Sequence, residues 1–506
     1  MAELTRSQVL AFKKETTEGT LEALTAGTEF VPSREGTSIT NALDSVDTDE
    51  LVAGDIGASA PVVVGSTPSL SWPFYVRHSG VEGQAPNWGV TIESSLGDVD
   101  TNGTEHDTIA ASTTSVIKLD VGEGASHPVG SALLIKDGTN GYEIRNVDSV
   151  STDDLTMNFN IANAPASGVN TGKHVLYRPV GTGHPTYSAY RYQAASSSAF
   201  KEAVSGVRTT SLGMEFPAKD LITGTVEGEG LKYYWNQVVI DATNNKIDIT
   251  DDGGVIAVTL ESKVYATQLE FAAEVATKCT AASVGSGDDV ISCVYDSSTG
   301  RYTLSSSGST FELLWLSGAN NATGAYAELG FDKVDETGAT TYTSDSAATY
   351  DPDFTPDFDD ADVIVARNAE LLLGDNDEIT CRKASNISLT IDTPKTDVNS
   401  ICAVTGRAAT LTLERTVTLS ATLILEEHEA EIFDRAINNT TTKFMFNFGE
   451  KDSSGNWEAG KCINVYMQSA KINATPVQDQ DGYAIIALEA TGFVTSSTKD
   501  VYINFI

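Results

Sequence analysis

The densest group of potential metal ligands in this sequence lies between Asp351 and Asp362, where aspartates occupy positions 351, 353, 357, 359, 360 and 362. Closely spaced carboxylates can coordinate Ca²⁺. The segment lacks the turn glycine and the terminal glutamate of an EF-hand loop, and Pro352 and Pro356 stiffen it. We therefore expect a solvated acidic linker over 351–362, with a cation site as the alternative.

A second group of ionisable residues surrounds His428, within Glu426-Glu427-His428-Glu429. On a helix such an imidazole titrates on an exposed face more often than it binds a metal. The sequence contains no GxSxG, HExxH, GxxxxGK[ST] or GxGxxG motif, and no pair of carboxylates stands out for sugar hydrolysis. We expect no catalytic residue, no cofactor and no bound metal, and hence not an enzyme.

The charge of the whole chain limits its partners. Its formal net charge is -38 over 506 residues, with no acidic tail to carry it. A surface of that sign repels nucleic acid and anionic membranes, which excludes a protein that reads DNA or RNA. It does not exclude a conduit through which nucleic acid slides without adsorbing. Solubility alone is the competing explanation of the acidity.

Composition indicates a folded, mostly β protein. Hydrophobic residues make up 40% of the chain and charged residues 20%, and Ala, Thr, Ser, Val and Gly dominate the uncharged part. The five cysteines are widely spaced without a CxxC pair, which favours reduced, mostly buried thiols. Because the chain starts without a secretory signal and has no run of membrane-spanning length, we expect a soluble protein made in a cytoplasm, with no membrane partner.

Changes in composition and in hydrophobic pattern along the chain divide it into six segments. We expect a first β segment over 1–100, a small independent β domain over 101–182, a middle β segment over 183–235, an α+β domain over 236–350, the acidic linker over 351–362 and a last β segment over 363–506. In the first segment, 33–55 is predicted to be a long ordered loop.

Local signals predict particular elements within these segments. The α+β domain should contain a helix over Thr267–Lys278, because Thr267 and Glu270 form a capping box. Its apolar stripe would be Leu269, Ala272, Ala273 and Val275. The last segment should contain a helix near 427–437 among long strands, and 224–230 reads as a flexible turn that ends the middle segment.

Two N-terminal stretches, Lys14-Glu-Thr-Thr-Glu-Gly-Thr20 and Ala26-Gly-Thr-Glu-Phe-Val-Pro-Ser-Arg-Glu35, resemble the start of the major tail tube proteins of long-tailed bacteriophages. Residues 62–70, 211–216 with 228–230, and 404–407 with the strands after them are similar in character to core strands of that family. The resemblance covers the first hundred residues, a short middle section and about the last 140.

That resemblance implies a β-sandwich or barrel-like fold with a flanking helix, in which six copies close into a ring and rings stack into a tube. The two extra units, one β and one α+β, would then be domains inserted at loops and displayed outside. DNA would pass through the lumen unbound, and the other tail proteins (tip, terminator and tape measure) would be partners, in a virion assembled in the host cytoplasm. The candidate inter-ring contacts on the predicted loop are Arg34, Glu35, Asp44, Asp47, Asp49 and Glu50.

Two other readings remain open from the residues. The chain could be another virion component, such as a tail-tip or decoration protein, with a different ring number or a monomer that binds a preformed lattice. A carboxylate-dependent hydrolase acting on cell-surface polymers would instead need a cleft holding a carboxyl group of raised pKa.

Overall fold

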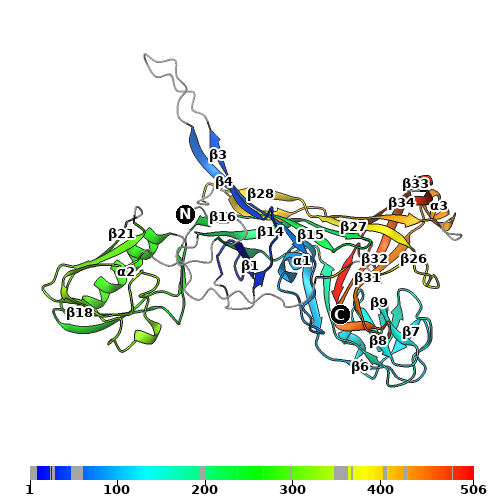
Figure 1. Ribbon diagram of the computed structural model, residues 1–506, viewed down its shortest axis with the longest axis horizontal. Coiled ribbons are helices and arrows are strands. Elements are labelled where there is room, and N and C mark those ends of the chain that lie inside the picture. The colour runs from blue at the N-terminus through cyan, green and yellow to red at the C-terminus, as the bar shows by residue number, and fades with distance from the viewer. Residues whose placement is uncertain are drawn as a thin grey trace, which may run out of the picture.

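The computed structural model describes residues 8–22, 24, 29–46, 61–193, 200–235, 237–265, 267–296, 299–346, 363–365, 369–402, 407–425, 430–480 and 482–506. Strands make up 52% of the structure and helices 8%. The predicted mainly-β class is therefore confirmed. Figure 1 shows an elongated molecule in which a large curved sheet forms the body.

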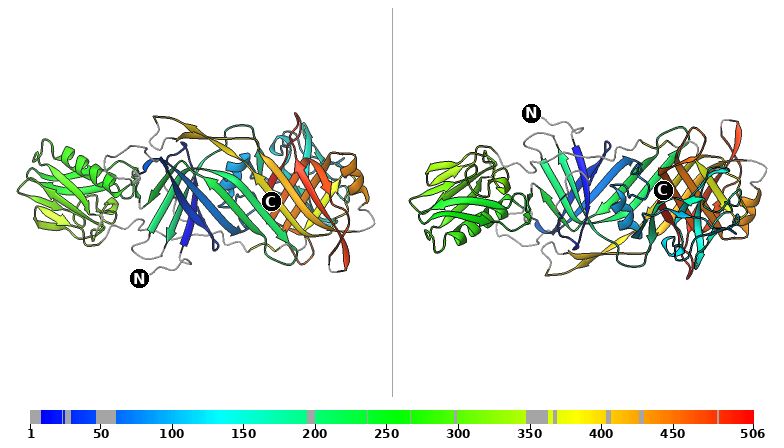
Figure 2. Two further views of the ribbon diagram at one scale, coloured as in Figure 1. Left: turned by 90° about the horizontal axis from the view of Figure 1, so that it is seen from above. Right: turned by 90° about the horizontal axis from the view of Figure 1, so that it is seen from below.

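Seven antiparallel strands form what we call the first layer. In spatial order they are β3 (Ser38–Val46), β4 (Val62–Tyr75), β15 (Thr223–Glu229), β14 (Phe200–Pro217), β27 (Ala384–Asp392), β30 (Thr416–Ile424) and β34 (Tyr483–Gly492). The first half of β14 also pairs with β13 (Tyr187–Gln193) and β16 (Lys232–Trp235), and beyond β13 lie β1 (Gln8–Lys14) and β2 (Phe30–Val31). Viewed from above, the strands cross the middle of the molecule side by side (Figure 2, left).

A second layer packs against the first. Its strands, in order, are β26 (Glu370–Gly374), β31 (Thr442–Lys451), β32 (Trp457–Ala474), β35 (Tyr502–Phe505), β12 (His174–Pro179) and β5 (Gly97–Asn102). The far end of β32 pairs with β34, which also pairs with the short β33 (Gln478–Gln480), so the two layers are continuous.

Aromatic side chains fill the space between the layers. Trp72 stacks on Phe74 with ring centroids 4.1 Å apart, and Phe216 of β14 packs edge-on against Phe446 and Phe448 of β31. The helix α1 (Gly89–Leu96) is almost wholly buried in this core beside β14. Its short β-branched and Ser-rich sequence gives no helical signal, so tertiary packing rather than propensity explains why it was not predicted.

A six-stranded sheet, here called the first inserted sheet, lies between β5 and β12 in the chain. Its order is β6 (His106–Asp107), β11 (Asn170–Thr171), β8 (Ala132–Asp137), β9 (Gly141–Ser151), β10 (Asp154–Met157) and β7 (Val116–Lys118), with a 3₁₀ turn η2 (Gly124–Ser126). It occupies 106–171 of the segment predicted over 101–182, because β12 belongs to the second layer of the body.

The second inserted unit, 237–346, has a hydrophobic cluster of its own and lies at one end of the molecule in Figure 1. Its sheets are β17 (Val238–Ile240) with β20 (Lys263–Tyr265); β19 (Gly254–Thr259), β18 (Lys246–Asp251), β23 (Phe311–Leu313) and β24 (Glu336–Ala339); and β21 (Ile291–Asp296), β22 (Arg301–Ser306) and β25 (Thr341–Thr343). The short 3₁₀ turn η3 (Asn321–Thr323) follows β23.

The predicted helix of this unit is present as α2 (Gln268–Ser283), and the Thr267 hydroxyl accepts the Glu270 N–H at 3.1 Å as the capping box requires. The predicted apolar stripe was partly wrong. Leu269 is exposed, and the buried face instead runs through Phe271, Val275 and Cys279.

Two predicted irregular segments are strands. Residues 38–46 of the expected 33–55 loop form β3, and 223–229 form β15. The glycines of β15 point into the body and make room for large neighbours: a Cβ on Gly224 would lie 2.3 Å from the Phe74 ring. The last segment adds a hairpin of β28 (Lys395–Asn399) and β29 (Arg407–Thr412), and the helix α3 (Ala430–Ile437) near the predicted place.

Candidate functional site

The face of the first layer that points away from the core is lined by small polar side chains and carboxylates. Buried and half-exposed residues alternate along its strands, as on β30, where Val417 and Leu419 are buried and Thr418 and Ser420 are not. Cross-strand register brings the half-exposed set onto one surface, the polar face. Its hydroxyl residues include Ser38, Thr40, Ser69, Ser71, Ser211, Thr223, Thr225, Ser388, Thr390, Thr416, Thr418, Ser420, Thr422 and Thr491, and its acidic residues are Glu215, Glu227, Glu229, Asp392 and Glu489.

Among these positions of the seven strands, Arg208 of β14 is the one cationic residue. It lies opposite Glu229 of β15, and its guanidinium donates to Glu18 at 2.8 Å. At one border the Arg34 guanidinium stacks over the ring of Tyr75, 4.3 Å from its centroid. At the other border, on β32, the Lys471 ammonium donates to the Asn439 carbonyl. Apart from Arg208, the charged residues of the face between them are acidic, so most of the face repels phosphate groups.

Hydrogen bonds between neighbouring strands tie down the polar side chains. Ser71 donates to Glu227 at 2.8 Å, and Ser211 donates to Asp392 at 2.7 Å. Burial against its neighbours raises the pKa of Glu215 above its usual value, although a hydrogen bond with Asn386 acts in the opposite direction. Side chains held in this way have few groups left to bind a passing polymer.

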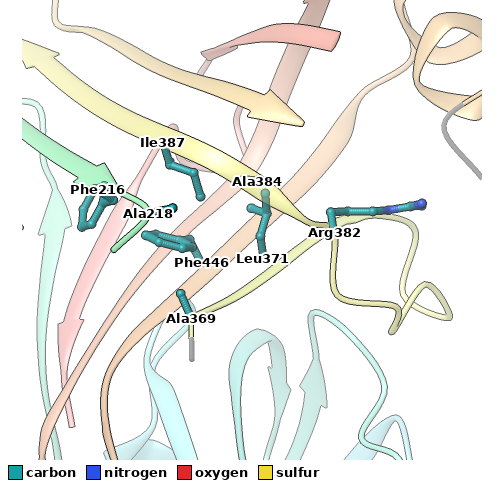
Figure 3. A pocket seen from close by; sticks show the side chains of 8 residues that line it. All are labelled: Phe216, Ala218, Ala369, Leu371, Arg382, Ala384, Ile387 and Phe446. Atoms are coloured by element: carbon teal, nitrogen blue, oxygen red, sulfur yellow. The ribbon is translucent and has the colours of Figure 1, made fainter. Parts of the chain in front are cut away.

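Two hollows adjoin this layer. A hollow of about 190 Å³ lies on the polar face over β27, β30 and β34. A smaller cavity of about 70 Å³ opens between the layers, where Phe216, Ile387 and Phe446 supply apolar walls (Figure 3). The smaller one has space for a few water molecules and not for a polymer substrate. The lining of the larger one contains a single carboxylate, that of Glu489.

Strands β3 and β4 continue beyond the body as a two-stranded arm (Figure 1). Four apolar side chains on it, Leu43 and Val62 to Val64, are each between 52% and 60% exposed. An isolated hairpin is marginally stable in water, and a group of exposed aliphatic side chains marks an interaction surface. The arm is therefore a candidate interaction surface.

Three of the six residues predicted to make inter-ring contacts lie on this arm or at its root. Arg34 and Glu35 lie in the turn at its root, where the Arg34 carbonyl accepts the Thr37 hydroxyl at 2.8 Å. Asp44 lies on β3 opposite Gly65. The other three, Asp47, Asp49 and Glu50, lie outside the described residues.

The β28–β29 hairpin is a second apolar projection that sequence reasoning missed. Val398, Ile401, Leu411 and Leu413 are exposed on or beside it. It pairs with no further strand within the described parts of the chain. The signal is present in the sequence, because Leu411 and Leu413 extend the apolar alternation of Ala409–Leu425, a pattern that predicts one continuous strand.

The two ionisable clusters singled out in the sequence, Asp351–Asp362 and His428 with its neighbours, lie outside the described residues. Across the ranges that the structure does describe, no group of three or more His, Cys, Asp or Glu side chains is arranged to hold a metal ion. Within those same ranges, no helix is long and apolar enough to span a membrane.

No protein-family model matches this chain, and comparison with curated proteins gives no significant match. A functional conclusion therefore has to come from the polar face, the two hairpins and the resemblance of the N-terminal residues.

Proposed function

We propose that this chain is a structural subunit that assembles with copies of itself into a hollow tube, with the polar face lining the bore. In this proposal it is the major tail tube protein of a long-tailed bacteriophage, its two layers form a tail-tube-like sandwich, and six copies close each ring. It performs no catalysis, and its lumen conducts DNA.

The observation that carries the proposal is a face seven strands wide whose outward positions hold hydroxyls, carboxylates and a single cationic side chain, Arg208, which is ion-paired with Glu18. Proteins hold duplex DNA mainly through contacts between cationic side chains and phosphates. A wall of hydroxyls and carboxylates offers no such contact, and its negative field keeps the polyanion away from the surface. DNA would therefore move past it with little adsorption.

The apolar hairpins support self-assembly. A tube needs contacts around each ring and between successive rings, and exposed strands can supply both by pairing with neighbours. The β3–β4 arm and the β28–β29 hairpin each carry exposed aliphatic residues that a second copy would cover. This would bury surface that is otherwise in contact with water.

The inserted units leave the polar face open. The first inserted sheet packs on the second layer, on the side opposite the first layer in Figure 1. The second unit extends from one end of the body. Both positions are compatible with placement outside a bore that must admit duplex DNA.

Light scattering and negative-stain electron microscopy of the purified protein test the proposal. We expect six-fold rings or hollow tubes, either alone or after addition of tail tips. A monomer that forms neither rings nor tubes, and that does not add to tail tips, would contradict it and favour a decoration protein.

A further inference from the structure

Three histidines from separate segments meet where the first inserted sheet joins the body. They are His106 on β6, His127 just after η2, and His174, the first residue of β12. The ring centroids of His106 and His127 are 5.1 Å apart, and those of His127 and His174 are 5.3 Å apart. His106 is 8% exposed and the other two are 0% exposed. The group is thus closed off from solvent.

None of the six ring nitrogens has a hydrogen-bond partner among the described residues. His184, another buried histidine, shows the contrast: its two nitrogens lie 3.1 Å and 3.2 Å from the carbonyl oxygens of Ser94 and Val180. A buried polar atom without a partner destabilises the folded state. The cluster therefore contributes unfavourably to the stability of the closed arrangement.

The charged groups around the cluster can do little to stabilise a protonated histidine. Glu123 Oε1 lies 3.2 Å from His106 Nδ1, without hydrogen-bond geometry, and its side chain is 32% exposed. Asp153 is turned to the backbone, accepting the N–H groups of Gly122 and Gly124 in the turn before His127. On β5, the residue opposite His174 is the uncharged Asn102. One imidazolium can face Glu123, but a second would be buried among other imidazoles.

Burial, together with the neighbouring histidines, lowers the pKa of His127 to about 4 and that of His174 to about 3. The ordinary value of about 6.5 is restored when the rings are exposed to water. Between these values the opened state binds more protons than the closed state, so the closed state loses stability as the pH falls below about 6.5.

We propose that His106, His127 and His174 form an acid-sensitive latch that holds the root of the first inserted sheet against β12. The latch is closed at neutral pH, when the His127 and His174 rings are uncharged. Acidification opens it locally, because a second protonated ring has no carboxylate to face. The β6–β11 pair and the turn before His127 are released first. This proposal does not depend on the tube function.

Hydrogen–deuterium exchange of the full chain at pH 7 and pH 5, corrected for intrinsic exchange rates, tests the latch. If both His127 and His174 titrate at their ordinary pKa in the opened state, the opening constant rises on the order of 500-fold over this interval. We expect that loss of protection in peptides covering 105–110 and 170–176. Peptides from β14 and β27 serve as the internal reference. Equal loss of protection in all of these peptides would overturn the latch.

Two single variants sharpen the test. His174→Gln removes one titrating ring and should reduce the local effect to about 20-fold. His184→Gln, the control, removes a buried histidine outside the cluster and should leave the local effect unchanged. All measurements are made both with and without EDTA. Acid sensitivity that vanishes in EDTA, or that His174→Gln does not reduce, would contradict the proposal.

Discussion

Asn146 of the first inserted sheet and Asn464 of β32 donate to each other's side-chain oxygen, at 2.7 Å and 2.9 Å, across the interface between insert and body. Both side chains are fully buried. Asn447 and Asn504 join the same network through Asn464. The inserted sheet is therefore attached through a buried polar network, in addition to apolar contacts.

Replacing Asn464 should destabilise the body and the insert together. Asn464→Ala removes one partner each from Asn146, Asn447 and Asn504 in a buried place, and unsatisfied buried polar groups cost about 1–3 kcal/mol each. We expect a loss of about 2–4 kcal/mol in the free energy of unfolding, measured by denaturant titration. Asn473→Ala, at an exposed position of the same strand, is the control. Equal stability of the two variants would contradict the role of the network.

Deleting each inserted unit should give opposite results. The second layer is buried on both sides, since Met445 and Tyr466 pack against the first inserted sheet while their neighbours fill the core. Removing 103–173 exposes that surface and should yield insoluble or unstable protein. Removing 237–346 with a short Gly-Ser bridge removes a unit with its own core and should leave the body folded. Circular dichroism melts and solubility distinguish these outcomes, and loss of fold in the second deletion would show that its boundary is wrong.

Polar substitutions on the arm should abolish assembly without weakening the subunit. In Leu43→Ser with Val63→Ser, two side chains that are exposed in the single chain lose the apolar surface that a neighbouring copy would cover. We expect an unchanged melting temperature and no rings or tubes by light scattering. The matched control, Val255→Ser with Val290→Ser, changes exposed valines of the second inserted unit and should assemble normally. Tubes of normal length from the arm variant would exclude the arm from assembly.

Cationic residues on the polar face should make it bind DNA. Ser388→Lys with Thr390→Lys places two positive charges per subunit on adjacent outward positions of β27. Assembled protein should then retain duplex DNA in a salt-sensitive manner, whereas the unmodified protein should not. The control, Ala339→Lys with Thr341→Lys, adds the same charge on exposed positions of the second inserted unit. Equal retention by both variants would indicate net charge and not the bore.

Sequence patterns predicted the elements that carry strong local signals. The capping box of Thr267 and Glu270 located α2, and the apolar alternation of Lys246–Thr250 and Ile387–Ile391 is the corresponding signal for β18 and β27. The arm was predicted to be a loop because β3 has polar residues on both faces and pairs outside the core. Strand β15 was not predicted, because glycines usually indicate a turn. Here Gly224 instead makes room for the large Phe74 ring beside the strand.

The polar face illustrates what a single sequence leaves out. The alternation of hydroxyls with buried residues along β30 is legible in the sequence. The sequence does not reveal which other strands share the layer of β30. Two of them come from distant parts of the chain, β14 from its middle and β4 from its start. The histidine cluster has the same origin: His106, His127 and His174 are brought together only by long-range pairing.

Helical reconstruction of the assembled protein by electron cryomicroscopy tests the central claim most directly. The account predicts a hollow tube in which β4, β14, β27 and β30 face the bore with their polar side, the first inserted sheet lies outside, and the β3–β4 arm contacts a neighbouring copy. A tube whose bore is lined by any other surface, or in which the polar face is buried between subunits, would contradict it.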